Sequence, residues 1–230
     1  MSSSPSYLDP VVLPLIRGDT VLDVGCGYGR WCHLIRSNYW EAEARPQPPA
    51  VDGFDAFQAN VDFCRAANCY RRVWQQELPS PLEGFWDTVL AVEVIEHVAA
   101  FEEVVELLEE VAAKRIIFTT PNWPFFREGH GTMLGFNEFE AHLSYVPGEF
   151  FERRGYELRG AGWGRPTSRF VKATKRRLGE KAQLFSGLPR VFPSLGETLV
   201  AFKDLSRVTA NRHAQSSSRA AAAQPRAAVR

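Results

Sequence analysis

Three glycines at alternate positions, Gly25, Gly27 and Gly29, directly follow the apolar run at 21–24, which also carries Asp23. Glycine tolerates positive φ and lets the backbone come close to a ligand. The helix expected after this turn directs its first N–H groups and the positive end of its dipole to the same place. The stretch suits a small ligand with a carboxylate or phosphate group, although a strand-to-helix turn without any ligand would use similar residues.

The spacing of the glycines separates two classes of nucleotide ligand. The dinucleotide fingerprint Gly-x-Gly-x-x-Gly, counted from Gly25, requires glycine at position 30, where this sequence has Arg30. The order Asp-x-Gly-x-Gly-x-Gly instead resembles the first motif of class I S-adenosylmethionine (SAM)-dependent methyltransferases. The resemblance implies that SAM is the cofactor. Its methionine end would lie at Asp23, Gly25, Cys26, Gly27 and Gly29.

The elements that position this turn alternate between strand and helix. Apolar runs and helical spacing predict five strand–helix units, then a helix over 147–154 and two closing strands. The expected strands are 20–24, 51–55, 71–75, 85–92, 114–120, 156–162 and 196–205. The fold class is therefore α/β, a doubly wound seven-stranded sheet that is mostly parallel. The resemblance, which covers about residues 15–205, implies the order 3-2-1-4-5-7-6 with an antiparallel last strand.

Further cofactor contacts are expected where the second and third strands end. Asp55 closes the second strand, and ligands of open parallel sheets bind at that edge. Its carboxylate could accept hydrogen bonds from both ribose hydroxyls, as an acid does in the resembling methyltransferases, with Ala56 beside it. A helix N-cap is the structural alternative, and Asp52 is a weaker competitor for the ribose. The resemblance places adenine after the third strand, at Gln76 or Glu77.

The end of the fourth strand, Glu93-Val94-Ile95-Glu96-His97, offers groups for the transfer itself. Methyl transfer needs the nucleophile and the methyl group in line, and a base only when the acceptor must lose a proton. His97 is the best candidate base because imidazole titrates near neutral pH. Glu93 would touch the methionine end of SAM or the acceptor. Alternatively, Glu96 and His97 cap the following helix.

A long aromatic and histidine-rich segment, 122–145, follows the fifth strand, and loops of this length are usually functional. Within it, residues 136–144 resemble an Asn-x-x-x-x-His-x-Ser pattern that shapes the pocket lid in a bacterial and archaeal branch of these enzymes. This makes His142 a second candidate base or acceptor contact. A structural role for a single loop histidine is the alternative.

The pentapeptide at the end of the fourth strand, 93–97, also resembles the metal-binding motif of small-RNA 2′-O-methyltransferases. That resemblance implies a divalent ion held by Glu93, Glu96, His97 and a later histidine, His130 or His142. The main interpretation assigns no metal ligand.

Two motifs of DNA methyltransferases are absent from the sequence. No Asp/Asn-Pro-Pro-Tyr follows the fourth strand, which disfavours methylation of DNA amino groups, and no Pro-Cys dipeptide occurs, which disfavours methylation of cytosine C5.

The net charge of zero hides an uneven distribution, because residues 165–230 contain 14 Lys and Arg but three Asp and Glu. A basic surface of this kind suits nucleic acid, anionic lipid or acidic glycan, and a solvated surface with a disordered tail is the alternative. We expect one domain over 1–208, with a basic helical insertion at 165–194, and a disordered tail over 209–230. The helix at 168–185 could contact a membrane surface.

No run of 18 apolar residues and no signal-peptide pattern occurs. We therefore expect a cytoplasmic protein in which Cys26, Cys32, Cys64 and Cys69 are reduced. The predicted function is transfer of a methyl group from SAM to a small-molecule, glycan or lipid-precursor acceptor, most simply at oxygen. Nucleic acid is a less favoured partner, the oligomeric state is open, and a catalytically silent SAM-binding domain is the alternative of another class.

Overall fold

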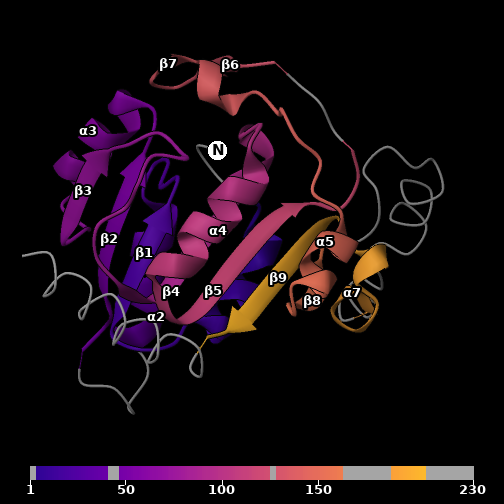
Figure 1. Cartoon of the computed structure of the whole chain (residues 1–230). Coiled ribbons are helices and arrows are strands. Elements are labelled where there is room, and N and C mark those ends of the chain that lie inside the picture. The colour runs from indigo at the N-terminus through magenta and orange to yellow at the C-terminus, as the bar shows by residue number, and fades with distance from the viewer. Residues whose placement is uncertain (1–3, 41–46, 125–127, 163–187, 206–230) are drawn as a thin grey trace, which may run out of the picture.

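The computed structural model describes residues 4–40, 47–124, 128–162 and 188–205. A seven-stranded sheet in the order β3-β2-β1-β4-β5-β9-β8 forms its centre (Figure 1). The strands are β1 (Thr20–Val24), β2 (Ala50–Asp55), β3 (Arg72–Gln75), β4 (Trp86–Val92), β5 (Ala112–Pro121), β8 (Glu157–Ala161) and β9 (Thr198–Asp204). Each lies within about two residues of its predicted bounds.

The pairing of the strands agrees with the expected topology. Strands β1 to β5 pair in parallel, whereas β9 pairs antiparallel with both β5 and β8. In the central register, Asp23 lies beside Gly53 of β2 and Leu90 of β4. The order 3-2-1-4-5-7-6 is therefore confirmed, with the last two strands renumbered because a small hairpin precedes them.

Helices cover both faces of the sheet because alternate strand residues point to opposite sides. On one face, Leu90 and Val92 of β4 pack in a core with α1 (Asp9–Val12), η2 (Leu13–Leu15) and α2 (Arg30–Trp40). On the other face, Val89 and Ala91 pack with α4 (Phe101–Val111) and α5 (Gly148–Arg153). The parallel strands are buried on both faces, as their nearly continuous apolar runs predicted.

The remaining elements connect the sheet or lie at its edges. They are η1 (Ser6–Leu8), α3 (Gln58–Ala67), η3 (Ile95–His97), η4 (Glu138–Glu140), α7 (Leu188–Val191) and η6 (Pro193–Leu195). The segment after β5 was expected to be a loop, but it contains a hairpin of β6 (His130–Thr132) and β7 (Gly135–Asn137). Antiparallel backbone pairing satisfies its peptide groups, which an irregular loop would leave to water.

The expectation of four reduced cysteines is wrong for one pair. Cys32 of α2 and Cys69, which precedes β3, form a disulfide, and Cys26 and Cys64 are free and buried. The two cysteines are 37 residues apart in the chain, a separation that gave no sequence signal. They meet because α2, β2 and the segment before β3 share one core cluster. The predicted basic helix at 168–185 and the tail at 209–230 lie outside the described residues. Within the described part, no helix is long and apolar enough to cross a membrane.

Candidate functional site

A cleft of about 640 Å³ lies at the carboxyl ends of β1, β2, β3 and β4. This volume is within the range typical of small-molecule sites. Its lining joins segments that are far apart in the chain: Gly25, Phe54, Asp55, Ala56, Gln76, Glu77, Leu78, Pro79, Val94, His97, Val98, Ala99, Ala100, Glu138, Phe139, Ala141 and Leu143. Several predicted site residues, from four strand ends, therefore meet in one cavity.

The glycine-rich turn needs its glycines for backbone conformation. Gly25, Gly27 and Gly29 have φ angles of 63°, 53° and 76°, a region that residues with side chains seldom adopt. A Cβ on Gly25 would also come 2.7 Å from Cγ2 of Val94. The N–H of Cys26 donates to the carbonyl of Phe54 at 2.9 Å, which anchors the turn to the end of β2. Close packing against Val94 therefore requires a glycine at position 25, and this residue lines the cleft.

Asp55 lies in the cleft, and its carboxylate also organises the surrounding backbone. Oδ2 accepts a hydrogen bond of 2.8 Å from the N–H of Gly27, and Oδ1 accepts from the N–H of Phe57 at 2.9 Å and from Nδ2 of Asn60 at 3.1 Å. These contacts hold the chain just before α3, but the N-cap of that helix is Phe57 and not Asp55, so the N-cap alternative is wrong. A carboxylate has about four acceptor sites, so it retains capacity for a ligand hydroxyl.

Of the first motif, Gly25 lines the cleft, whereas the other predicted residues, Asp23, Cys26, Gly27 and Gly29, are not among the described residues that line it. Asp23 is buried, and its Oδ2 accepts a hydrogen bond of 2.5 Å from the hydroxyl of Tyr70. Burial raises the pKa of Asp23 to about 7, and the hydrogen bond from Tyr70 opposes this rise. Cys26 is buried with its Sγ 3.9 Å from Sγ of Cys64.

Gln76 and Glu77 both line the cleft, but their side chains differ in the hydrogen bonds that they make. The side chain of Gln76 accepts from Nε1 of Trp74 at 2.7 Å and donates to the carbonyls of Ser80 and Pro81 at 3.1 and 2.8 Å. These bonds hold the turn that follows β3. No side-chain hydrogen bond of Glu77 is among those of the described residues, so Glu77 is the less constrained of the two.

Glu93 follows β4 in a left-handed conformation, with φ of 55°, and it is buried. Its N–H donates to the carbonyl and to Oγ1 of Thr119 at 3.1 and 3.0 Å, and Thr119 Oγ1 donates to Glu93 Oε1 at 2.9 Å. A non-glycine residue at this φ costs of order 1 kcal/mol, and such strain is concentrated at functional sites. Glu93 is not one of the described residues that line the cleft.

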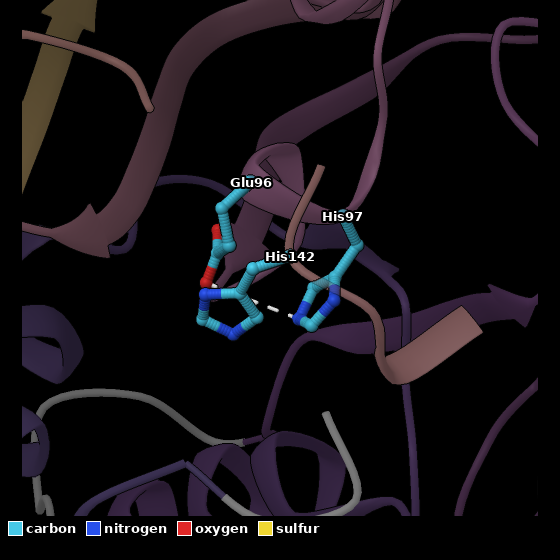
Figure 2. A group of neighbouring side chains, drawn as sticks. All are labelled: Glu96, His97 and His142. Atoms are coloured by element: carbon cyan, nitrogen blue, oxygen red, sulfur yellow. Dashed lines mark ion pairs between the residues drawn. The ribbon is translucent and has the colours of Figure 1, made fainter. Parts of the chain in front are cut away.

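Glu96, His97 and His142 come together beside the cleft (Figure 2). One ligand atom of each residue lies within 4.8 Å of those of the other two. The two imidazole rings pack edge to face, with their centroids 4.7 Å apart. His97 Nδ1 lies 2.9 Å from the carbonyl oxygen of Ala141, so it carries the proton and Nε2 is the basic nitrogen. Nε2 lies 4.0 Å from Glu96 Oε1.

The electrostatics of this cluster follow from its burial. Burial, reinforced by His142, lowers the pKa of His97 to about 3, so the imidazole is neutral in ordinary buffers. Burial and the nearby charge of Glu93 raise the pKa of Glu96 well above its usual range. Neither oxygen of Glu96 has a hydrogen-bond partner among the described residues.

Several site residues escaped the sequence analysis. Tyr70, Asn60 and Thr119 have no motif around them, and their roles depend on contacts with Asp23, Asp55 and Glu93. The apolar lining residues Leu78, Pro79 and Leu143 gave no sequence signal either. His130 begins β6, and its side chain is outside the described part of the structure.

Comparisons with known proteins agree with the fold. Among solved structures, DhpI in its complex with SAM and HEP aligns with a TM-score of 0.53 at 15% identity, covering 85% of this chain and 82% of DhpI. Coclaurine N-methyltransferase bound to N-methylheliamine and S-adenosylhomocysteine (SAH) gives 0.51 at 14% identity, covering 86% and 72%. At these identities the likeness concerns the fold alone.

No curated protein matches the sequence. A family model described as a methyltransferase domain, however, matches residues 6–160, which is more than half of the chain and includes the glycine-rich turn, Asp55 and the Glu93–His97 segment. The chain therefore belongs to the methyltransferase domain family and is a SAM-dependent methyltransferase.

Proposed function

We propose that the protein transfers a methyl group from SAM to an oxygen of a small-molecule, glycan or lipid-precursor acceptor. The observation that carries the proposal is the shared cleft, in which the glycine turn, Asp55 and the turn after β3 meet His97. SAM, when bound, supplies an activated methyl group on a sulfonium. The chain must therefore bind, orient and exclude water, and remove a proton where the acceptor is a hydroxyl.

The residues around the cleft fit SAM in shape and chemistry. Gly25, which lines the cleft, suits the amino-acid end, Asp55 has acceptor capacity for ribose hydroxyls, and Leu78 and Pro79 offer an apolar surface for adenine beside Glu77. In this assignment Gly27, Gly29, Asp23 and Cys26 shape the turn, Ala56 borders the ribose, and Gln76 holds the adenine turn. Glu93, locked by Thr119, fixes the end of β4 between cofactor and acceptor.

His97 is the favoured proton acceptor. Its Nδ1–H is committed to the carbonyl of Ala141, so Nε2 carries the free lone pair, and its neutral state is available throughout the physiological range. A base of such low pKa removes a proton weakly by itself. Occupation of the cleft by a polar acceptor would replace part of the apolar surroundings that depress the pKa. His142, in contact with His97, would orient that ring or contact the acceptor.

The test has two stages. Calorimetry with SAH first asks whether the cofactor binds, and absence of binding would contradict the cofactor assignment. Incubation with labelled SAM and fractionated cell extract then identifies the fraction that gains the methyl group. Mass spectrometry and NMR of the labelled product distinguish a methyl group on oxygen from one on nitrogen, and release of labelled methanol by base identifies a methyl ester. Tight SAH binding without transfer to any fraction would favour a silent SAM-binding domain.

A second candidate is metal-assisted O-methylation of RNA, and the cluster in Figure 2 is the specific observation that favours it. Two imidazoles and one carboxylate form a donor set that suits Zn²⁺, Fe²⁺ or Mn²⁺. The hydrogen bond from His97 Nδ1 to Ala141 is of the kind that orients a metal-binding histidine. The ligand set is Glu96, His97 and His142, whereas Glu93 is held by Thr119 instead.

Metal content separates the two candidates. In the metal-assisted reaction, an acceptor hydroxyl near the ion would lose its proton more easily. Removal of divalent ions with a chelator should then abolish transfer to RNA, and Mn²⁺, Fe²⁺ or Zn²⁺ should restore it. Stoichiometric metal in the wild type and its loss in Glu96→Gln would support this candidate. Full turnover after chelation, with no metal detected by elemental analysis, would exclude it.

A further inference from the structure

Tyr70 lies in the connection between α3 and β3, and its side chain reaches behind the glycine-rich turn. Its hydroxyl donates a hydrogen bond of 2.5 Å to Oδ2 of Asp23, the penultimate residue of β1. Asp23 is only 1% exposed. Tyr70 is not part of the cleft lining among the described residues. Any influence of Tyr70 on the cofactor must therefore pass through the turn itself.

The ring of Tyr70 also packs against two glycines. A Cβ on Gly53 of β2 would come 2.7 Å from Cε1 of Tyr70, and one on Gly29 would come 3.2 Å from Cε2. Gly53 has no positive φ, so close approach of the ring is the reason that glycine suits this position. The ring therefore touches the strand beside β1 and the last glycine of the turn at the same time.

The neighbours of Tyr70 fix its backbone from both sides. Cys69 forms the disulfide with Cys32 of α2, and its carbonyl accepts a hydrogen bond of 2.7 Å from Nη1 of Arg36. On the other side, the N–H of Arg71 donates to Val51 of β2 at 2.8 Å, and its guanidinium pairs with Asp52 at 2.7 and 2.8 Å. A side chain anchored in this way can support the turn without itself moving.

The charge of Asp23 depends on its surroundings. Burial raises its pKa, the hydrogen bond from Tyr70 lowers it, and the charge of Asp55 raises it again. The pKa of the Tyr70 phenol is itself raised well above its usual value, mainly by burial, so the hydroxyl remains the donor. Cys26, next to the turn, is kept as a thiol because its hydrogen bond with Cys64 and burial raise its pKa. Among the described residues, these are the titratable groups that face Asp23.

We propose that Tyr70 is a positioning residue for the cofactor. By holding Asp23 and packing against Gly29 and Gly53, it keeps the turn at 25–29 in the conformation that receives the amino-acid end of SAM. The proposal rests on the proposed cofactor site but not on the identity of the acceptor. Where Asp23 is ionised, its carboxylate, held by Tyr70, also adds a negative charge behind the place where the ammonium group of SAM would lie.

The experiment compares Tyr70→Phe with Tyr156→Phe, a matched control. Tyr156 is also a buried tyrosine, and its hydroxyl donates to Glu109 Oε1 at 2.8 Å, on the face of the sheet covered by α4. SAH affinity is measured by calorimetry at pH 6 to 9. Tyr70→Phe should weaken binding by about tenfold at pH 7, because the hydrogen bond that holds Asp23 behind the turn is lost. The loss should shrink toward pH 9, where Asp23 ionises without help. Tyr156→Phe should keep wild-type affinity.

A double-mutant cycle shows whether Tyr70 acts through Asp23. In an Asp23→Asn background, Tyr70→Phe should have little further effect on SAH affinity. Should Tyr70→Phe fold poorly, Asp23→Asn alone must give a weakened affinity that no longer varies with pH near 7.

Three results would overturn the proposal: wild-type SAH affinity in Tyr70→Phe at every pH, an equal loss in Tyr156→Phe, or full additivity in the cycle. Failure of the wild type to bind SAH would instead contradict the proposed function.

Discussion

The N–H of Gly27 donates a hydrogen bond of 2.8 Å to Oδ2 of Asp55, which joins the turn after β1 to the end of β2. The same carboxylate accepts from Phe57 and Asn60 at the start of α3. One buried acid thus connects three segments around the cleft. Loss of this carboxylate should affect ligand binding in two ways, by removing an acceptor and by releasing the turn.

Asp55→Ala should weaken SAH binding at least tenfold, because hydrogen bonds to a charged acceptor contribute ~1.5–3 kcal/mol. Calorimetry on the folded variant measures the effect. Asp62→Ala is the matched control, since Asp62 is an exposed acid on α3 that pairs only with neighbours along that helix. Unchanged affinity in Asp55→Ala would refute the assignment of the ribose to this residue.

His97→Ala and His142→Ala should separate proton removal from orientation. With a hydroxyl acceptor, His97→Ala should lower kcat by about 10²- to 10⁴-fold, the usual contribution of a general base. His142→Ala should have a smaller effect, because His142 contacts the ring of His97. SAH affinity should hardly change in either variant. Equal kcat in His97→Ala and wild type would show that the acceptor loses its proton without this residue.

The disulfide between Cys32 and Cys69 should stabilise the half of the domain that holds the glycine-rich turn. Closing a loop of this length contributes about 2–4 kcal/mol to the free energy of unfolding. Urea denaturation with and without a reductant measures the difference. Cys32→Ser should unfold at the midpoint of the reduced wild type and should not respond to the reductant. Identical midpoints for the oxidised and reduced wild type would contradict the contribution.

The buried carboxyl of Asp23 should make stability depend on pH. Its folded-state pKa of about 7 lies above the ordinary value of 3.8, so the folded protein holds a proton that the unfolded chain has released in this window. The unfolding free energy contributed by Asp23 should therefore fall as pH rises, by about 2 kcal/mol between pH 5 and 7.

Asp23→Asn carries no such group. The difference in unfolding free energy between the wild type and this variant should decrease from pH 5 to pH 7, and chemical denaturation at both pH values measures it. Taking the difference between the two proteins cancels the contributions of the groups that titrate in both. A constant or increasing difference would contradict the raised pKa.

The sequence by itself determined the family and the sheet. Continuous apolar runs such as 85–92 are typical of strands buried on both faces, and Gly25, Gly27 and Gly29 have spacing that specifies a turn before a helix. These are local signals, carried by residues next to each other in the chain. They also located the strand ends that border the cleft, including Asp55 and His97.

Only the tertiary structure decided which of these residues act together. Glu93 and Glu96 are three residues apart, yet the left-handed backbone of Glu93 directs its side chain to Thr119, while Glu96 lies with His97 and His142. Tyr70 and Asp23, and likewise Cys32 and Cys69, meet because β1, β2 and β3 are neighbours in the sheet and α2 packs on the face of β1 and β2. Such contacts depend on packing between segments far apart in the chain, and no pattern of neighbouring residues specifies them.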